Sequence, residues 1–287
     1  FKIFMDIDLI NLIAIFITIF IIFVINYKNN FIAKKIALYD FPDKKLKLHS
    51  KQVPLIGGIY CFVFINLMTG IFLVYDLDKY SNYIIILLTS NIIFFIGLID
   101  DKINISPNLK LFLSFITIFL SLYFFNDFII KEIYFETFKY KLNLGMYSLP
   151  FSILCILLLI NALNMADGIN SLASSLVVTW CFSFIIFDIT NNKFLILLIG
   201  IFMIFISIKI YRSNFFLGDS GAMFLSTFIS LILISGYNFN KSNIDFPVEI
   251  IFIFLMLPGI DMFRLFIIRI YNKRNPFKGD LYHFHNY

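Results

Sequence analysis

The sequence predicts an all-α integral membrane protein, a polytopic bundle of about nine transmembrane helices in one domain, residues 1–287. Hydrophobic residues make up 60% of the chain and charged residues 14%, and the mean hydropathy is +0.91. This composition excludes a soluble domain with a polar surface. Cys61, Cys155 and Cys181 all lie inside apolar runs, which favours buried small side chains over disulfides or a metal cluster.

Nine apolar stretches are long enough to cross a bilayer. The first has no basic stretch before it and no small-residue cleavage pattern after it, so we expect a retained span and not a signal peptide. The longest connections are residues 28–52 and 126–148. The predicted spans are residues 7–27, 53–75, 83–99, 109–125, 149–165, 172–187, 194–210, 223–237 and 248–270.

The distribution of basic residues predicts how these spans are oriented. One set of alternate loops, with the C-terminal tail, holds sixteen Lys and Arg residues, and the other set holds seven. Because Lys and Arg are retained on the cytoplasmic side, the first set is predicted to be cytoplasmic. The connection 28–52 and the tail after residue 271 then face the cytoplasm, whereas the N-terminus and the connection 126–148 lie outside.

Acidic residues recur where spans end. Asp100 and Asp101 directly follow an apolar run, and two adjacent carboxylates there repel each other unless a cation or a phosphate-bearing ligand relieves the repulsion. The predicted orientation places further polar residues on the same cytoplasmic face. They are His49, Asn164, Asp167, Asp219, Asp280, His283 and His285. We therefore expect one active site on the cytoplasmic face.

The available side chains limit the chemistry of this site. The sequence contains no serine nucleophile with an elbow glycine, no HExxH, no Walker loop and no GxGxxG. Carboxylates, amides, histidines and lysines remain, and these suit Mg²⁺ and phosphates. Asp219 lies between Gly218 and Gly221, where the following span would direct its N-terminal N–H groups at an anion. Three more polar residues recur every third position, on one helical face: Asn161, Asn164 and Asp167.

These motifs resemble, in order, those of the polyprenyl-phosphate N-acetylhexosamine-1-phosphate transferases. The resemblance extends along nearly the whole chain. Each motif alone is weak, whereas five in order with a compatible topology are strong. They are Asp40-Phe-Pro to His49 and Pro54-Leu-Ile-Gly-Gly58, Asp100-Asp101 with Lys110, Asn161-Ala-Leu-Asn164-Met-Ala-Asp167-Gly168, Phe216-Leu-Gly-Asp219-Ser-Gly221, and Pro258 to Arg269 with the tail His283-Phe-His285.

The resemblance implies a UDP-N-acetylhexosamine donor, an undecaprenyl or other polyprenyl phosphate acceptor and Mg²⁺. It leaves open whether Mn²⁺ substitutes and whether the chain forms a homodimer. It implies the bacterial inner membrane as location and no nucleic acid partner. Asp219 would be the principal metal ligand, assisted by Asp101. Catalytic roles would fall on Asp100, Asp101, Asp167 and His283. The implied substrate-binding residues are His49, Lys51, Lys110, Asn161, Asn164, Arg274 and His285.

Some features depart from the family pattern. Asn170 stands where the family often has a second aspartate, Asn286 where it usually has a third histidine, and the chain stops at Tyr287 where relatives, with ten or eleven helices, continue. We therefore expect a truncated or divergent member. An inactive scaffold stays open as an alternative, and an ion-coupled transporter is disfavoured because the acids gather at one interface. Within the family, the first loop and the tail favour a simple UDP-N-acetylhexosamine donor over that of the phospho-MurNAc-pentapeptide transferase.

Three of these residues also have simpler interpretations. Asn161 could form a hydrogen bond between helices. Asp261 could form a helix-end ion pair with Arg264. His49 could be an ordinary loop histidine.

Overall fold

The computed structural model describes residues 9–40, 52–167, 171–190, 192–239 and 248–271. Within these ranges it is an almost entirely helical multi-pass bundle, which confirms the predicted all-α membrane class. The helices are α1 (Leu9–Ile36), α2 (Gly57–Tyr75), α3 (Leu77–Tyr80), α4 (Asn82–Ile103), α5 (Pro107–Phe124), α6 (Ser148–Ala166), α7 (Leu172–Ile186), α8 (Lys193–Tyr211), α9 (Gly218–Phe239) and α10 (Val248–Tyr271).

Each of the nine predicted spans coincides with one of these helices. Within the described residues, seven are long and apolar enough to cross a membrane: α1, α2, α4, α5, α6, α8 and α9. Helix α7 has only 15 residues, and α10 has Pro258 in its interior. Several predicted boundaries were wrong. Helix α1 continues to Ile36 instead of ending at residue 27. Residues 53–54 form a strand before α2, and α9 begins at Gly218 instead of residue 223, which places Asp219 in its first turn.

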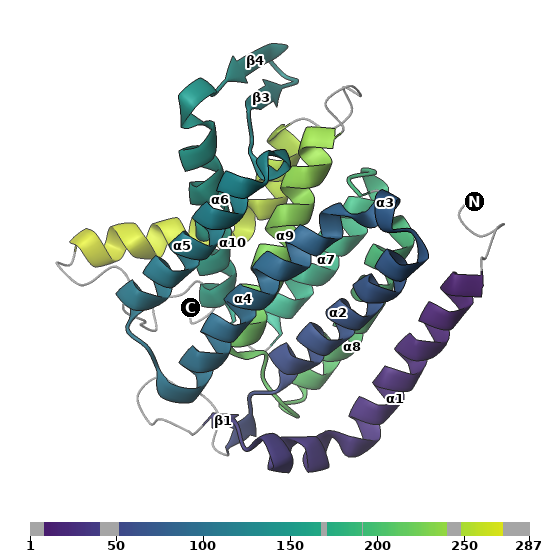
Figure 1. Cartoon of the computed structure of the whole chain (residues 1–287). Coiled ribbons are helices and arrows are strands. Elements are labelled where there is room, and N and C mark those ends of the chain that lie inside the picture. The colour runs from purple at the N-terminus through teal and green to yellow at the C-terminus, as the bar shows by residue number, and fades with distance from the viewer. Residues whose placement is uncertain (1–8, 41–51, 168–170, 191, 240–247, 272–287) are drawn as a thin grey trace.

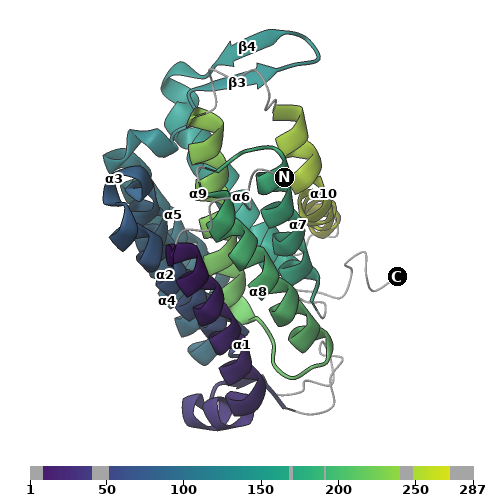
Figure 2. The same cartoon turned by 90° about the vertical axis from the view of Figure 1, so that its right-hand side faces the viewer.

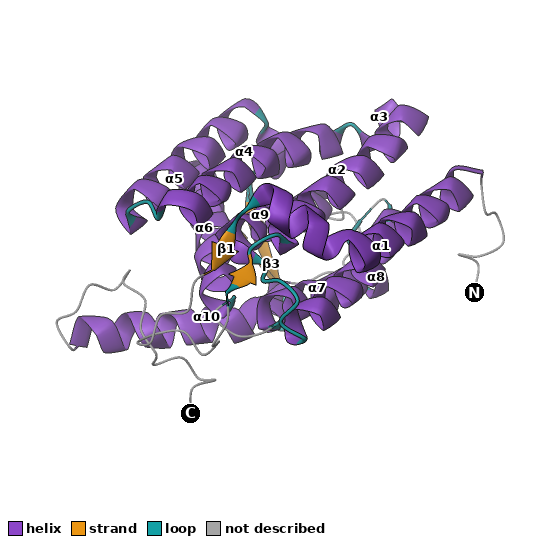
Figure 3. Cartoon of the chain, turned by 90° about the horizontal axis from the view of Figure 1, so that it is seen from below, coloured by secondary structure: helices purple, strands orange, loops and turns teal. Residues whose placement is uncertain are grey.

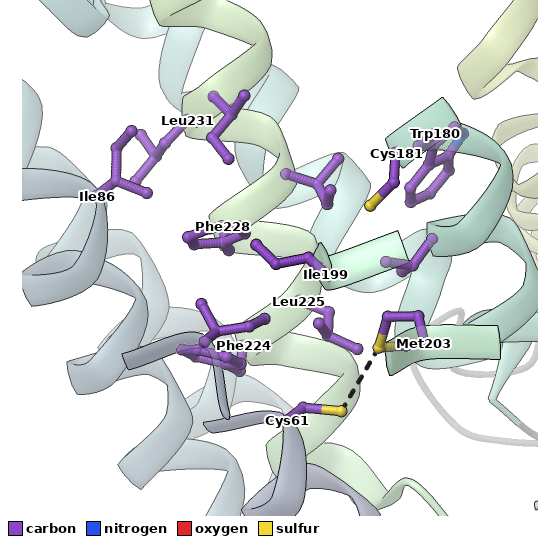
Figure 4. Close-up of a cluster of buried hydrophobic side chains, with 14 of the residues drawn as sticks. Cys61, Ile86, Trp180, Cys181, Ile199, Met203, Phe224, Leu225, Phe228 and Leu231 are labelled. Atoms are coloured by element: carbon purple, nitrogen blue, oxygen red, sulfur yellow. Dashed lines mark hydrogen bonds between the residues drawn. The ribbon is translucent and has the colours of Figure 1, made fainter. Parts of the chain in front are cut away.

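Helix α9 is the centre of the bundle. It packs against α2, α4, α6 and α7, and Figures 1 and 2 show it with helices on several sides. Of its membrane-spanning window, 83% is buried, compared with 17% for α1 at the periphery. The ring of Phe224 on α9 meets that of Phe94 on α4 edge-on, with the centroids 5.9 Å apart, and in Figure 4 Leu225 lies toward Met203 of α8. The residues of α9 are therefore held by protein and not by lipid.

The two ends of the bundle differ. At the lower end in Figure 1, strand β1 (Tyr39–Asp40) pairs antiparallel with β2 (Val53–Pro54), and Figure 3 shows this end from below. At the upper end, β3 (Glu132–Phe135) pairs with β4 (Tyr140–Asn143) in a hairpin. The sequence predicted the hairpin region only as a long connection, because its strands have four residues each.

Helix α10 bends in Figures 1 and 2, and the cause is Pro258. Proline has no N–H to donate to the carbonyl four residues earlier, and its ring crowds that carbonyl. That carbonyl belongs to Phe254, and the indole Nε1 of Trp180 on α7 donates to it at 3.0 Å. The Phe254 carbonyl, which Pro258 leaves without an intrahelical donor, thus accepts a hydrogen bond from a neighbouring helix.

Candidate active site

The site begins at the turn between α4 and α5. Helix α4 ends with Asn104 in the left-handed conformation, at φ 50°. Asp100 Oδ1 accepts from the Ile105 N–H at 2.8 Å, and Ser106 caps α5. This turn brings Lys110, in the first turn of α5, back to Asp100, where the Nζ–Oδ2 distance is 2.7 Å. Both side chains are largely buried, with Lys110 16% and Asp100 11% exposed.

Lys110 also joins this turn to α9. Its ammonium group forms an ion pair with Asp219 Oδ2 as well as with Asp100. The amide of Asn164 is oriented so that its nitrogen faces Asp219 and its oxygen faces Lys110. The nitrogen donates to Asp219 Oδ1 at 3.1 Å, and the oxygen accepts from Lys110 Nζ at 3.2 Å. Helices α4, α5, α6 and α9 thus each contribute one side chain to a single cluster, as the predicted one-sided arrangement requires.

Asp101 has a different place from its neighbour Asp100. Its Oδ1 accepts from the Asp219 N–H at 2.8 Å, and its Oδ2 accepts from the Ser220 N–H at 3.0 Å. Asp101 therefore caps the N-terminus of α9, where an anion is favourable. These N–H groups were expected to be directed at an anion, and the anion there is the chain's own Asp101 carboxylate. The metal-binding role of Asp101 stays a prediction.

Two glycines permit this close approach. A Cβ on Gly97 would lie 2.6 Å from Ser220 Cα, so α4 meets the first turn of α9 only because Gly97 has no side chain. Gly218 has φ +77°, and a Cβ there would lie 2.8 Å from Asp101 Oδ2. Sequence reasoning missed Gly97, although its spacing of four residues from Asp101 puts both on one face of α4.

The segment before Asp219 is fixed by the first loop. The Phe216 N–H donates to Pro54 O at 2.9 Å, and the Gly57 N–H donates to Phe216 O at 3.0 Å. The Gly58 N–H then donates to Leu217 O at 2.9 Å. The Pro54-Leu-Ile-Gly-Gly motif therefore supports the loop that presents Asp219.

Asp167, at the C-terminal cap of α6, joins the cluster from its remaining side. It lies close to the backbone N–H of Gly218, just before Asp219. Burial, with Asp219 and Asp101 nearby, raises the pKa of Asp167 well above its usual value. Asn161 lies further from this chemistry, since its amide donates to Leu157 O in its own helix at 2.8 Å. The interhelical bond considered for Asn161 does not occur among the described residues.

Several predicted residues lie outside the described part of the chain. They are His49, Lys51, Arg274, Asp280, His283 and His285, and their roles stay predictions. Asp261 is described, and its Oδ1 lies 3.0 Å from Arg264 Nη2. The ion pair considered for these two residues is therefore confirmed, but it lies inside α10 and not at a helix end.

The cluster is suited to a cation. Lys110 forms ion pairs with Asp100 and Asp219, and two more carboxylates, those of Asp101 and Asp167, lie near Asp219. No three His, Cys, Asp or Glu side chains of the described residues form a metal cage. Mg²⁺ does not need one, since one or two carboxylates suffice when water and substrate phosphates complete its shell. Asp219 and the Asn164 amide oxygen are oxygen donors of this kind, so the residues present fit the predicted metal.

Comparison with known proteins gives a consistent result. The model of the glycosyl transferase family 4 matches residues 83–237, from the start of α4 to near the end of α9. This stretch contains Asp100, Asp101, Lys110, Asn164 and Asp219. It therefore covers the whole described cluster.

Curated relatives align over most of the chain. The probable undecaprenyl-phosphate N-acetylglucosaminyl 1-phosphate transferase of Bacillus subtilis (strain 168) is 28% identical over 266 residues, covering 89% of this chain and 70% of the relative. The undecaprenyl-phosphate alpha-N-acetylglucosaminyl 1-phosphate transferase of Escherichia coli (strain K12) is 25% identical over 298 residues, covering 97% and 75%. The Yersinia pestis protein of the same name is 23% identical over 304 residues, covering 96% and 77%.

Proposed function

Because the chain belongs to glycosyl transferase family 4, we propose that it transfers N-acetylhexosamine 1-phosphate from a UDP-sugar to undecaprenyl phosphate. An oxygen of the lipid phosphate would attack the sugar-bearing phosphorus of the donor. The bond from that phosphorus to the bridging oxygen would break, UMP would leave, and a sugar-bearing lipid pyrophosphate would form. Such a product initiates a lipid-linked glycan, such as an O-antigen, a capsule or a related envelope polysaccharide.

The observation that carries this proposal is the Asp100–Lys110–Asp219 cluster at the end of a transmembrane bundle. A lipid phosphate and a nucleotide meet at such a boundary, because one substrate is anchored in the bilayer and the other is dissolved in water. Both substrates are anions, and catalysis of phosphoryl transfer consists mainly of positioning and electrostatic stabilisation. An ion-coupled transporter is supported less well, because the clustered acids Asp100, Asp101, Asp167 and Asp219 lie where helices begin or end and not midway along the spans.

The chain's own residues have distinct tasks in this scheme. Lys110, held between two carboxylates, is placed to bind a substrate phosphate oxygen when one enters the cluster. Asn164 orients both Lys110 and Asp219 through its amide. Asp101 keeps Asp219 at the start of α9. When bound, Mg²⁺ would supply charge neutralisation on the pyrophosphate, with Asp219 as its protein ligand.

We place the site on the cytoplasmic face, where nucleotide sugars are made. The C-terminal ends of α1, α4 and α8, which carry several lysines, lie at the same end of the bundle as the cluster. An impermeant thiol reagent on intact cells should modify Lys139→Cys in the hairpin but not Lys45→Cys. Modification of position 45 from outside would overturn the orientation.

Transfer is tested directly with purified protein in lipid. Labelled UDP-N-acetylglucosamine and undecaprenyl phosphate should give lipid-linked label and free UMP, and Asp219→Asn should give neither at a comparable rate. Absence of both products with the unmodified chain would favour the scaffold or transporter alternatives. Efficient use of UDP-MurNAc-pentapeptide in place of UDP-N-acetylhexosamines would contradict the proposed donor class.

A further inference from the structure

The β3–β4 hairpin has one apolar and one polar face. In the antiparallel register, Ile133 pairs with Leu142 and Phe135 with Tyr140, so these four side chains share a face. The other face carries two further pairs, Tyr134 with Lys141 and Glu132 with Asn143. The hairpin is therefore amphipathic, although it lies at the end of the bundle far from the acid cluster (Figure 1).

The hairpin is fixed to the helices beneath it. The Tyr134 N–H donates to the Tyr237 hydroxyl of α9 at 2.9 Å. The Glu249 carboxylate of α10 accepts from the Glu136 N–H at 3.3 Å and from the Thr137 N–H at 3.1 Å. These bonds come from two helices, so the orientation of the strands relative to the bundle is set by the fold.

Ile133 shows which way the apolar face points. Its side chain is 8% exposed and lines an apolar cavity of about 130 Å³ with residues of α6, α9 and α10. Leu142 and Tyr140 share this face, so they also point toward the bundle end, yet they are 39% and 57% exposed. Part of the apolar face thus extends beyond the helices that cover Ile133.

The exposed residues around this face are of the types that are common at the membrane–water interface. Phe138 at the hairpin tip is 77% exposed, and Tyr147 and Met146, just before α6, are 70% and 85% exposed. Lys139 and Lys141 are exposed beside them. Aromatic side chains with neighbouring lysines are typical of the level where a membrane helix meets the lipid headgroups. The hairpin joins α5 to α6 at that level, because both helices are membrane spans.

We propose that the exposed part of the apolar face of the hairpin, formed by Phe135, Tyr140 and Leu142, rests together with Phe138 at the tip on the headgroup region of the bilayer leaflet opposite the active site. The partner is phospholipid. The face lies at the end of the bundle where the connection between the membrane spans α5 and α6 crosses, and it would carry its aromatic rings toward the acyl chains. Lys139, next to Phe138 at the tip, would reach lipid phosphates, whereas Lys141 pairs with Tyr134 on the opposite face. This contact tethers the ends of α9 and α10 to that leaflet through Tyr237 and Glu249.

The register supplies a matched pair of probes for this contact. Tyr140→Cys places a thiol on the apolar face, and Lys141→Cys places one on the opposite face, at the next position along the same strand. Each full-length variant is labelled with an environment-sensitive NBD maleimide and reconstituted in vesicles of phosphatidylcholine and phosphatidylglycerol. Unmodified protein carried through the labelling gives the background from Cys61, Cys155 and Cys181.

Nitroxide-labelled phosphatidylcholine in the vesicles should quench the probe at position 140 at least about twofold more than the probe at position 141, and the emission at 140 should be blue-shifted. Equal, weak quenching with water-like emission at both positions would overturn the proposal. A blue-shifted probe at 140 that lipid nitroxides leave unquenched would also overturn it, because protein and not lipid would then cover the face. A Phe138→Cys probe repeats the test at the tip if either strand variant fails to fold.

Discussion

Replacing Asp101 by Asn separates two roles for this residue, capping of α9 and metal ligation. The carboxylate accepts two backbone hydrogen bonds, from the N–H groups of Asp219 and Ser220, at 2.8 and 3.0 Å. An asparagine side chain has one oxygen, so it can keep one of these bonds at most. The variant therefore removes a negative charge and one charge-assisted bond from the first turn of α9.

The expected loss in the free energy of unfolding of Asp101→Asn follows from these two hydrogen bonds. Loss of a helix cap costs about 0.5–2 kcal/mol, and a hydrogen bond to a charged group contributes about 1.5–3 kcal/mol. Removing one negative charge from beside Asp167 and Asp219 offsets part of this loss. We expect Asp101→Asn to lower the free energy of unfolding by roughly 1–2 kcal/mol. Turnover should fall by about ten- to a hundredfold, because Asp219 shifts within the site.

The assay compares the Mg²⁺ dependence of turnover in Asp101→Asn and Asp219→Asn. If Asp101 acts as the cap, the Mg²⁺ concentration for half-maximal rate should stay within about twofold of wild type in Asp101→Asn. In Asp219→Asn it should rise about tenfold or more, as expected for loss of a ligand charge. An equal rise in both variants, with unchanged thermal stability of Asp101→Asn, would refute the capping role.

Three further substitutions have definite expectations. Asp219→Asn should lower the rate at saturating Mg²⁺ by about a hundredfold or more, with expression little changed. Near-wild-type turnover of the purified variant would count against a metal-ligand role for Asp219. Asp261→Asn should reduce thermal stability at least as much as turnover, because Arg264 loses the partner 3.0 Å away; full stability with lost activity would point to a catalytic role instead. Trp180→Phe should lower the free energy of unfolding by about 1–3 kcal/mol, because a carbonyl of α10 loses its donor. Thermal unfolding in detergent measures this loss, and an unchanged midpoint would mean that water replaces the indole.

Long apolar runs made the helices predictable from sequence. The same runs did not define their ends, because the first turn of α9 is polar and small, and its start is fixed by Asp101 from a distant part of the chain. The hairpin was missed because strands of four residues give too short an alternating pattern to stand out within a connection.

The gathering of Asp100, Lys110, Asn164 and Asp219 was predictable, since topology alone placed them at one end of the bundle. The different contacts of Asp100 and Asp101 were not predictable from the sequence. Adjacent residues on a helix differ by about 100° in direction, so one turns toward Lys110 and the other toward α9. Whether Asp100 or Asp101 is the one that faces α9 depends on how α4 packs against α9, and this packing depends on Gly97.

The central position of α9 has a consequence for biogenesis. Helix α9 carries hydroxyl groups at Ser226, Thr227 and Ser230, and each donates to a carbonyl of its own helix. In the folded protein, neighbouring helices and not lipid cover most of its surface. Its packing partners α2, α4 and α6 all precede it in the chain, so they are in the bilayer before α9 leaves the ribosome. Partitioning of α9 out of the translocon is therefore a step of tertiary assembly, in which the newest helix enters a groove already formed by older ones.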